Sequence, residues 1–258
     1  ELNRGSTFLK ENSINTYKLD SELLLSKALN KRREYLFLNS KENLSNNLIN
    51  NFQSLLDRRK KKEPVAYILN NKEFWKYNFY VDRNVLIPRP DTEILVEEVM
   101  KLYSNEQKLS VLDIGTGSGC IIISILKDRP KFNGIAIDIS KKAINIAKYN
   151  AKMHHLNNRI KFYKTSVDNF FKDKYDLIVS NPPYISRLKL KYLEKDIFGF
   201  EPIQALEGGI DGFNVFSKIV KKSSMLLKVG GKLVLEIGFD QKFKMLKLLK
   251  KYNFFVNK

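Results

Sequence analysis

Apolar side chains recur at helical spacing through residues 1–60. One group is Leu19, Leu23 and Leu24, and a clearer one is Leu44, Leu48, Phe52, Leu55 and Leu56. Ser40 is a candidate cap for the helix that contains the second group. The polar residues 58–63 and then Pro64 end the pattern, which predicts a small helical domain over residues 1–63.

Two runs rich in β-forming and aromatic residues come next, at residues 65–69 and 74–81, separated by Asn70-Asn71-Lys72. This order of strand, turn and strand predicts a β-hairpin, which we expect to link two domains over residues 64–90. Trp75 is expected to pack within the hairpin rather than to take part in chemistry.

From Thr92 onward, short apolar runs alternate with longer amphipathic ones. The expected strands are residues 110–114, 134–138, 160–163, 175–180 and 232–237. The expected helices are residues 92–103, 119–127, 141–154, 212–227 and 241–249. This alternation predicts an α/β fold, a mostly parallel sheet with helices on both faces, over residues 91–258. Ligands of that architecture bind beyond the carboxyl ends of the strands, where the unusual residues of this chain are found.

The first unusual segment is a glycine loop that follows the strand at residues 110–114. Its expected cofactor-binding residues are Asp113, Gly115, Thr116, Gly117, Ser118 and Gly119. Glycines let the backbone turn sharply and approach a ligand at the positive end of a helix. This spacing suits S-adenosylmethionine better than a dinucleotide, because no pyrophosphate has to be held. Asp113 either orients the loop or meets the cationic amino acid end of the cofactor, and a tight turn that binds nothing is the alternative.

Asp138 ends the next strand, nineteen residues after Gly119. A carboxylate in that place can accept hydrogen bonds from both ribose hydroxyls of a nucleoside cofactor. An Asp before a helix also serves as an N-cap, so two interpretations stay open.

The sequence Asn181-Pro182-Pro183-Tyr184 follows the apolar strand at residues 175–180. Two prolines fix the backbone and free its carbonyls, so Asn181 and the Pro182 carbonyl can accept both hydrogens of a planar NH2 group. Tyr184 offers an aromatic face for the same group. We therefore expect Asn181, Pro182 and Tyr184 to be catalytic, and Asn181, Pro182, Pro183 and Tyr184 to bind the substrate. A simple strand-ending turn is the alternative.

Composition sets limits on the class of protein. The chain is 43% hydrophobic and 29% charged, as in ordinary globular proteins, and it has no apolar run that could span a membrane. We expect a cytoplasmic enzyme without a metal, because there is one cysteine and no metal-ligand spacing. The net charge of +18 invites a nucleic-acid partner, but 36 of the 46 basic residues are Lys, which favours compositional drift.

These motifs resemble those of the PrmC/HemK family, the release factor glutamine methyltransferases. The resemblance covers nearly the whole chain and includes residues 73–75, 85–93, 201–206, 208–212 and 235–238. It implies a helical N-terminal domain that recognises the release factor, a β-hairpin linker and a Rossmann-like class I methyltransferase domain. It also implies that Gly115 to Gly119, Asp138 and Asn181 touch S-adenosylmethionine, and that Asn181 to Tyr184 bind a glutamine.

The chain departs from the family in two places. Where the family has an acidic residue followed by a large side chain beside the adenine, this chain has Ser166-Val167, with Asp168 close by. Val167 is the residue expected at the adenine. The chain also starts without Met and stops at Lys258, before the last strand of the family, so we expect a fragment at both ends.

The expected reaction is methyl transfer from S-adenosylmethionine to the N5 amide nitrogen of glutamine in the Gly-Gly-Gln loop of class 1 release factors, by a monomer. One rival is a nucleic-acid methyltransferase acting on adenine N6, which uses the same motif but has no extra recognition domain here. Others are a ribosomal protein glutamine methyltransferase and a module that only binds the cofactor. Arg89 either steadies the wall of the site or pairs with Glu93.

Overall fold

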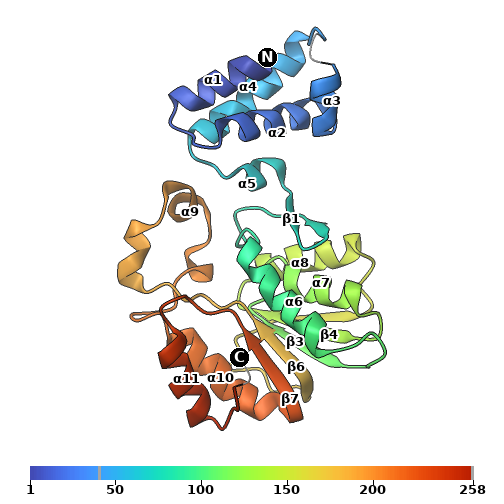
Figure 1. Ribbon diagram of the computed structural model, residues 1–258, viewed down its shortest axis with the longest axis vertical. Coiled ribbons are helices and arrows are strands. Elements are labelled where there is room, and N and C mark those ends of the chain that lie inside the picture. Colours follow the sequence, from blue (N-terminus) through green and yellow to red (C-terminus); the bar gives the residue numbers. More distant parts are fainter. Residues whose placement is uncertain (40–41, 257–258) are drawn as a thin grey trace. The chain divides into compact units, whose positions relative to one another are not determined.

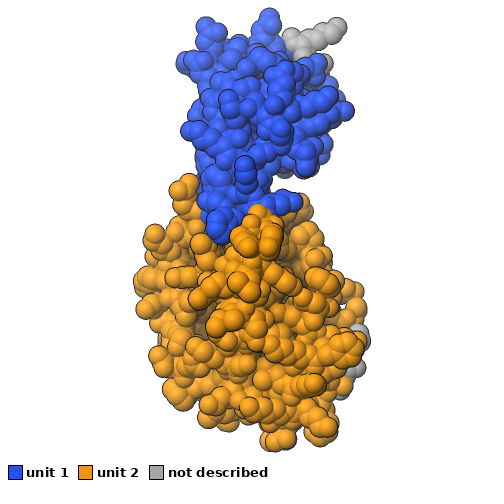
Figure 2. All heavy atoms as spheres, turned by 90° about the vertical axis from the view of Figure 1, so that its left-hand side faces the viewer, with its two compact units in different colours: residues 1–71, 194–200 blue, residues 72–193, 201–258 orange. Residues whose placement is uncertain are grey.

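The computed structural model describes residues 1–39 and 42–256 and divides into two compact units (Figure 1). Unit 1 comprises residues 1–71 and 194–200, and unit 2 comprises residues 72–193 and 201–258; Figure 2 colours the two units separately. The helical unit continues past the expected boundary at residue 63 to Asn71 and takes in a short segment that is distant in sequence.

Unit 1 contains only helices in its described part, as the sequence predicts. They are α1 Leu2–Glu11, α2 Tyr17–Leu29, α3 Arg33–Leu38, α4 Asn46–Lys60, α5 Val65–Leu69 and α9 Lys195–Phe200. Leu44 precedes α4, whose N-cap is Ser45, while the cap expected at Ser40 lies outside the described residues. The helices meet in an apolar core in which Leu9, Leu24, Phe52 and Leu56 are fully buried.

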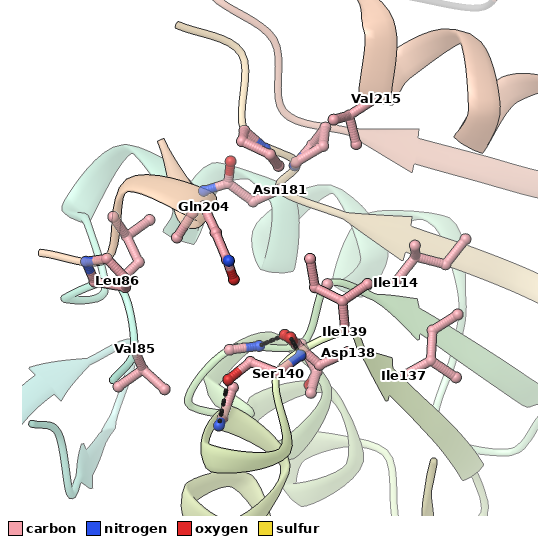
Figure 3. Close-up of a pocket in the computed structure, with 18 of the residues that line it drawn as sticks. Val85, Leu86, Ile114, Ile137, Asp138, Ile139, Ser140, Asn181, Gln204 and Val215 are labelled. Atoms are coloured by element: carbon pink, nitrogen blue, oxygen red, sulfur yellow. Dashed lines mark hydrogen bonds between the residues drawn. The ribbon is translucent and has the colours of Figure 1, made fainter. Parts of the chain in front are cut away.

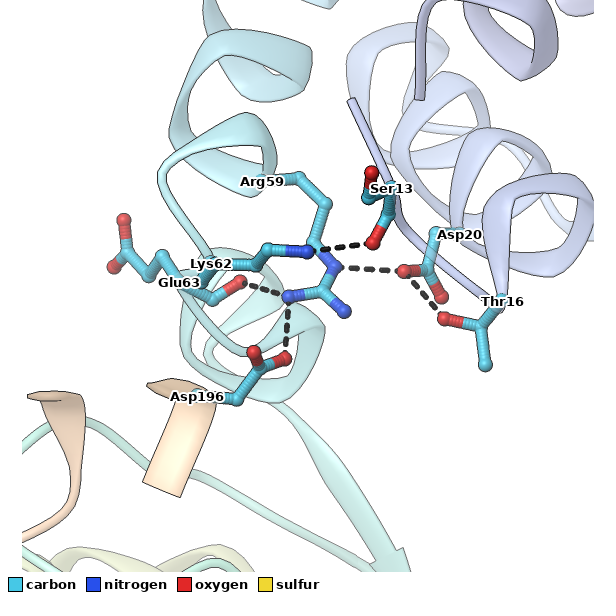
Figure 4. A network of polar contacts seen from close by, with 7 residues as sticks. All are labelled: Ser13, Thr16, Asp20, Arg59, Lys62, Glu63 and Asp196. Carbon is cyan, nitrogen blue, oxygen red and sulfur yellow. Dashed lines mark hydrogen bonds and ion pairs between the residues drawn. The ribbon is translucent and has the colours of Figure 1, made fainter. Parts of the chain in front are cut away.

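A buried polar network joins three segments of unit 1 (Figure 4). Arg59 of α4 donates from Nε to Asp20 Oδ2 of α2 at 2.7 Å, and from Nη1 to Asp196 Oδ2 of α9 at 2.7 Å. The same Nη1 also donates to the Glu63 carbonyl at 3.1 Å, and the Thr16 hydroxyl donates to Asp20 at 2.8 Å. Asp196 therefore anchors the distant segment in this unit through a charge that is shielded from water.

The β-hairpin of unit 2 differs from the expected one. Its strands are β1 Lys72–Phe74 and β2 Tyr77–Phe79, both shorter than predicted, and the turn places Trp75 at a positive φ of 58°. Residues 65–69, expected as the first strand, form helix α5 of unit 1 instead. The hairpin is fixed by Asp128 at the end of α7 (Cys120–Asp128), which accepts hydrogen bonds from Trp75 Nε1 and the Tyr77 hydroxyl.

The main sheet of unit 2 has five parallel strands in the order β5-β4-β3-β6-β7. Their bounds are β3 Ser110–Ile114, β4 Asn133–Asp138, β5 Ile160–Lys164, β6 Tyr175–Ser180 and β7 Leu227–Leu235. The other helices are η1 Pro90–Thr92, α6 Glu93–Leu102, α8 Lys141–Met153, η2 Arg187–Tyr192, η3 Ile203–Ala205, α10 Asn214–Leu226 and α11 Lys242–Lys251. Each strand and helix expected after Thr92 is present, β3 and β6 with the expected bounds and the others with shifted ends, so the predicted α/β, Rossmann-like fold is confirmed.

Both faces of the sheet are buried, because alternate residues of each strand point to opposite sides. Val111 of β3 and Leu177 of β6 pack in one cluster with α6 and α7. Leu112 and Ile178, their neighbours in sequence, pack in a second cluster with α10. This double burial explains why the strands read as continuous apolar runs rather than as alternating ones.

The order of the strands places a ligand site. The chain leaves β3 toward β4 on one side and later returns to β6 on the other side of β3. Loops at such a point diverge above the sheet and leave a crevice at the carboxyl ends of the two strands. The glycine loop follows β3 and Asn181 follows β6, and these strands pair directly, so the two motifs are neighbours. Across the described residues, no helix is long and apolar enough to cross a membrane.

Candidate active site

A cavity of about 490 Å³ lies at the carboxyl ends of the parallel strands (Figure 3). Its volume is within the range of small-molecule sites, roughly 300 to 1,000 Å³. Its wall is largely apolar and includes Val85, Leu86, Ile114, Ile137, Ile139, Val215 and Ile219. Asp138 and Ser140 lie on one side of it and Asn181 on the other, so the two sets of polar groups expected from the sequence face one cavity.

The glycine loop forms the floor of the cavity through Gly115, Thr116, Gly117 and Ser118. Gly115 and Gly117 have positive φ values of 75° and 55°, and a Cβ on either would meet no atom within 4 Å. The space beside them is therefore open to a ligand. Gly119 does not line the cavity; a Cβ there would lie 2.9 Å from Ile123 Cδ1, so this glycine permits close packing of α7 instead.

Asp113 is fully buried beneath the loop and does not line the cavity. Its Oδ2 accepts a hydrogen bond from the Thr116 hydroxyl at 2.6 Å, which ties the strand to the loop. Burial, with the charge of Asp138 adding to it, raises the pKa of Asp113 to about 7. Its Oδ1 is buried and accepts no hydrogen bond from the described residues. Of the two roles expected for Asp113, orienting the loop is the one that these contacts support.

Asp138 uses both carboxylate oxygens. Oδ2 accepts from the Gly117 amide at 3.0 Å, and Oδ1 accepts from the Ser140 amide at 2.8 Å (Figure 3). The N-cap of α8 is Ser140, whose hydroxyl oxygen accepts from the Ala143 amide at 3.2 Å. Asp138 is therefore not the helix cap, and it lines the cavity. Burial raises the pKa of this carboxyl.

Ser166, Val167 and Asp168 form another part of the wall, after β5. Val167 is buried and lines the cavity, and its expected contact with the adenine stays a prediction. The Asp168 carboxylate pairs with Lys218 Nζ of α10 at 3.2 Å. A small aliphatic side chain thus stands where the resemblance implies a large one, and the Asp168–Lys218 ion pair lies beside it.

The Asn181-Pro182-Pro183-Tyr184 segment is divided between the cavity and the protein interior. Asn181, Pro182 and Pro183 line the cavity, whereas Tyr184 does not. The Tyr184 ring packs on a cluster with α10 and α11, and its hydroxyl donates to Glu236 Oε1 at 3.3 Å. The structure therefore brings three of the four motif residues to the cavity and gives Tyr184 a supporting position behind them.

Arg89 also lines the cavity, and its partner is Glu201 rather than Glu93. The Arg89 guanidinium donates to Glu201 Oε1 at 2.6 Å, and the Ile87 amide donates to Glu201 Oε2 at 3.3 Å. Glu93 instead accepts from the Trp75 amide at 2.8 Å. Of the two roles considered for Arg89, support of the wall is the observed one.

Three functional positions escaped the sequence argument: Thr92, Glu201 and Glu236. Each lies in a segment that carries the family resemblance, but none stands at a spacing that predicts a contact. Thr92 and Glu236 are linked by a hydrogen bond of 2.6 Å across 144 residues. The only feature of the sequence that pointed to these residues was the resemblance of their segments to the family. Among residues 1–39 and 42–256, no group of three or more His, Cys, Asp or Glu side chains is placed to hold a metal ion.

The residues present fit a nucleoside cofactor with a cationic end. The open space beside Gly115 and Gly117 admits a ligand against the backbone. Asp138 lines the cavity, and a carboxylate there can accept hydrogen bonds from a ribose diol. The apolar wall suits an adenine ring, and Asp138 is a carboxyl group on the wall of the cavity that can meet a polar or cationic part of the ligand.

Comparison with known proteins adds the family. The PrmC N-terminal domain model matches residues 2–69, and the methyltransferase small domain model matches residues 90–198. A release factor glutamine methyltransferase of Clostridium botulinum is 39% identical over 256 residues, covering 98% of this chain and 90% of that protein. One from Buchnera aphidicola is 39% identical over 246 residues, covering 95% and 87%.

Other relatives are longer or more distant. A bifunctional methyltransferase of Rickettsia typhi is 38% identical over 272 residues, covering 98% of this chain, but the chain spans about half of that relative, 52%. The solved catalytic domain of hMettl16, bound to an RNA hairpin, aligns with a TM-score of 0.55 and 20% identity over 67% of this chain and 65% of that one. A ribosomal protein L11 methylase from Lactobacillus delbrueckii aligns with a TM-score of 0.50 and 22% identity, over 66% and 72%.

The solved structures show the class I methyltransferase fold alone. The sequence relatives go further, since they match both the helical region and the sheet domain at nearly full length. The resemblance drawn from the motifs and the expected cofactor are thereby confirmed at the level of the family. This chain belongs to the release factor glutamine methyltransferases, a family that uses S-adenosylmethionine as its methyl donor.

Proposed function

We propose that this protein transfers a methyl group from S-adenosylmethionine to the N5 amide nitrogen of the glutamine in the Gly-Gly-Gln loop of class 1 peptide release factors. The observation that carries the proposal is the placing of Asn181, Pro182 and Pro183 on the same cavity as the glycine loop and Asp138. A primary amide held at Asn181 then lies within one enclosed space with the methyl donor. Family membership supports the same substrate.

The proposed cofactor residues are Gly115, Thr116, Gly117 and Ser118 at the floor, Asp138 at the ribose and Val167 at the adenine. Asp113 holds the loop from below through Thr116. When bound, S-adenosylmethionine supplies an electrophilic methyl group on a sulfonium.

The protein holds the amide by hydrogen bonds that grow stronger during transfer. Asn181 Oδ1 and the Pro182 carbonyl accept the two hydrogens of the glutamine NH2, which leaves the face of the nitrogen free. An amide nitrogen is a weak nucleophile, because its lone pair is delocalised into the carbonyl. As the nitrogen gains positive charge, its N–H groups become better donors, so these two acceptors favour the transition state over the ground state. The excess proton leaves to solvent.

We further propose that the helical unit 1 recognises the body of the release factor, and that the protein acts as a cytoplasmic monomer. A Gly-Gly-Gln loop fits a narrow cavity, because two glycines carry no side chains that could collide with its rim. Contacts elsewhere on the factor then have to supply most of the affinity.

The test is methyl transfer from labelled S-adenosylmethionine, offered in parallel to release factor, ribosomal proteins, DNA and rRNA. Mass spectrometry should find one added methyl on the glutamine of the Gly-Gly-Gln loop, and none on a factor in which that glutamine is asparagine. A methyl on ribosomal protein or on nucleic acid, with the release factor unmodified, would replace this proposal by one of its rivals. No transfer to any acceptor, with the cofactor bound, would indicate a binding module.

A further inference from the structure

A chain of hydrogen bonds runs behind Asn181, away from the reacting groups. Asn181 Nδ2 donates to the Thr92 hydroxyl oxygen at 3.0 Å, and the Thr92 hydroxyl donates to Glu236 Oε2 at 2.6 Å. The Tyr184 hydroxyl donates to the other oxygen of Glu236 at 3.3 Å. Thr92 is only 2% exposed, so water does not compete for its hydroxyl. The four side chains come from three separate segments of unit 2: η1, the Asn181–Tyr184 segment and the end of β7.

The backbone fixes the carboxylate end of this chain of bonds. Glu236 directly follows β7, and its amide donates to the carbonyl of Ser180, the last residue of β6, at 3.1 Å. Asn181 is the next residue after Ser180. The parallel pairing of β6 with β7 thus sets the Glu236 carboxylate beside the residue that it serves.

The number of available protons decides which way the Asn181 amide points. An ionised carboxylate only accepts, and a hydroxyl has one hydrogen to give. Because Thr92 gives its hydrogen to Glu236, its oxygen can only accept from Asn181. Asn181 must therefore present its NH2 group to Thr92. Its Oδ1 accepts no hydrogen bond from the described part of the chain and is the amide atom left for the cavity that Asn181 lines.

We propose that Thr92 and Glu236 are positioning residues that keep the Asn181 oxygen turned toward the substrate, and so select an acceptor group that carries N–H donors. This inference rests on the proposed function of Asn181. A turned amide would bring its NH2 against the NH2 of the substrate, and two donors repel each other. A site built for a donor also rejects an isosteric side chain that lacks one, such as glutamate in place of glutamine.

The alternative is that these bonds only hold η1 and the end of β7 together. A structural role predicts loss of stability, whereas a positioning role predicts loss of kcat at unchanged cofactor affinity. Thr92→Val keeps the shape of the side chain and removes the hydroxyl, so the Asn181 amide loses the acceptor at 3.0 Å that favours its observed orientation. Thr92→Ser keeps the hydroxyl and is the matched control.

The first experiment measures kcat and the affinity for S-adenosylmethionine, with release factor as the acceptor. Thr92→Val should lower kcat about tenfold and leave the cofactor Kd within about twofold, while Thr92→Ser should restore most of the lost kcat. Glu236→Gln, which can donate to Thr92 and reverse the chain of bonds, should lower kcat at least about threefold. Wild-type kcat in Thr92→Val or in Glu236→Gln would overturn the role of that residue.

A double-mutant cycle separates action through Asn181 from any other effect of Thr92. Asn181→Asp has an acceptor on both sides of the group, so its orientation no longer matters. Thr92→Val should therefore cost little or nothing further in the Asn181→Asp background. An equal loss of kcat in both backgrounds would show that Thr92 acts independently of Asn181 and would overturn the inference.

A measurement without turnover keeps the inference testable if Asn181→Asp is inactive. The side-chain amide protons of Asn181, assigned by NMR through their absence in Asn181→Asp, should be protected from exchange in the wild type and exposed in Thr92→Val. Protection that is equal in both proteins would overturn the inference. If the wild type fails to methylate any release factor, the proposed function fails, and this measurement still decides the orientation.

Discussion

At the scale of single residues, the site depends on carboxylates that are kept away from water. Asp113 is the extreme case, since it is fully buried, has one hydrogen-bonded oxygen and forms no ion pair with any residue that the structure describes. Desolvation of this kind disfavours the charged form of the group. The loop beneath the cavity is therefore held by a residue that costs stability when it ionises.

Asp113→Asn should change how stability depends on pH. The pKa of Asp113 is about 7 in the folded protein and 3.8 when exposed, so the folded state retains a proton that the unfolded chain has lost. The contribution of protonated Asp113 to the free energy of unfolding is fully present below pH 3.8 and is lost as the pH rises through about 7. The unfolding free energy of Asp113→Asn relative to wild type should thus rise between these two values. Urea unfolding over a pH series measures it.

The control for this experiment is Asp128→Asn. The pKa of Asp128 is lowered, because hydrogen bonds from Lys76, Tyr77 and Trp75 outweigh the effect of burial. Its contribution to stability is present above the ordinary pKa and is lost as the pH falls, so its pH trend has the opposite sign. Parallel curves for wild type and Asp113→Asn would show that Asp113 does not titrate in this range.

Asp138→Ala should weaken S-adenosylmethionine binding by about tenfold or more, because hydrogen bonds to a charged group contribute about 1.5 to 3 kcal/mol each. Calorimetry measures the affinity. Ser140→Ala is the matched control: it removes the cap of α8 and should cost about 1 kcal/mol of stability with a smaller effect on affinity. If Asp138→Ala bound as tightly as wild type, this carboxylate would only shape the loop through Gly117.

Asn181→Ala should lower kcat by on the order of a hundredfold and change cofactor affinity little, because it removes an acceptor whose strength grows in the transition state. Asn181→Asp should retain part of the activity, since a carboxylate still accepts. Steady-state kinetics with release factor, together with calorimetry on the same proteins, separates the two effects. Nearly full kcat in Asn181→Ala would contradict the amide-holding mechanism.

At the scale of elements, the sequence predicted those strands and loops that have a recognisable local pattern of residues. The strands of the sheet are apolar runs buried on both faces, and the glycine loop and the Asn181 motif follow two of them, so their neighbourhood follows from topology. Residues 65–69 misled the prediction, because five residues rich in β-formers do not show a period. Pro64 at the N-cap and a left-handed Asn70 at the C-cap make them a helix.

Contacts between distant elements were out of reach of the sequence. The bond between Thr92 and Glu236 depends on the register of β6 with β7, and a single sequence does not specify that register. The ion pair between Arg59 and Asp196 joins α4 to α9 across 137 residues. Neither has a local pattern. The polar contacts behind Asn181 therefore could not be predicted from the sequence and are known only from the structure.

Arg59→Leu should destabilise unit 1 by about 3 kcal/mol or more, because it leaves the buried Asp20 without its partner. The matched control is Arg58→Leu, whose guanidinium is 42% exposed in its ion pair with Glu63, so this change should cost less than Arg59→Leu. Hydrogen exchange of the α2 and α4 amides measures the stability of unit 1 separately. This is needed because the two units need not unfold together. Equal losses for the two variants would mean that the network does not hold the unit.

The same hydrogen-exchange measurement can be made on a variant of Asp196, the second carboxylate that pairs with Arg59. Asp196→Asn should increase exchange in α9 and have less effect on α2, because Asp20 still pairs with Arg59. Unchanged exchange in α9 would show that its segment is held in unit 1 by other contacts.

At the scale of the whole molecule, two compact units divide the proposed work. The lining residues of the cavity belong to unit 2, while unit 1 has its own core and none of its described residues lines that cavity. A peptide loop with two glycines and one glutamine offers few groups to recognise. Recognition of a whole release factor therefore requires surface outside the cavity, and unit 1 is the proposed source of it.

This division predicts that the intact factor and a short Gly-Gly-Gln peptide differ in KM more than in kcat. Both present the same amide to Asn181, but only the factor reaches unit 1. Phe37 and Leu38, 58% and 84% exposed at the end of α3, are consecutive apolar side chains of the kind found in protein contacts. Replacing both by Ser should raise KM for the intact factor roughly tenfold, equivalent to about 1.4 kcal/mol, and leave KM for the peptide unchanged. A rise for both substrates would point to damage to the catalytic unit, and no rise for either would move the contact to another face of unit 1.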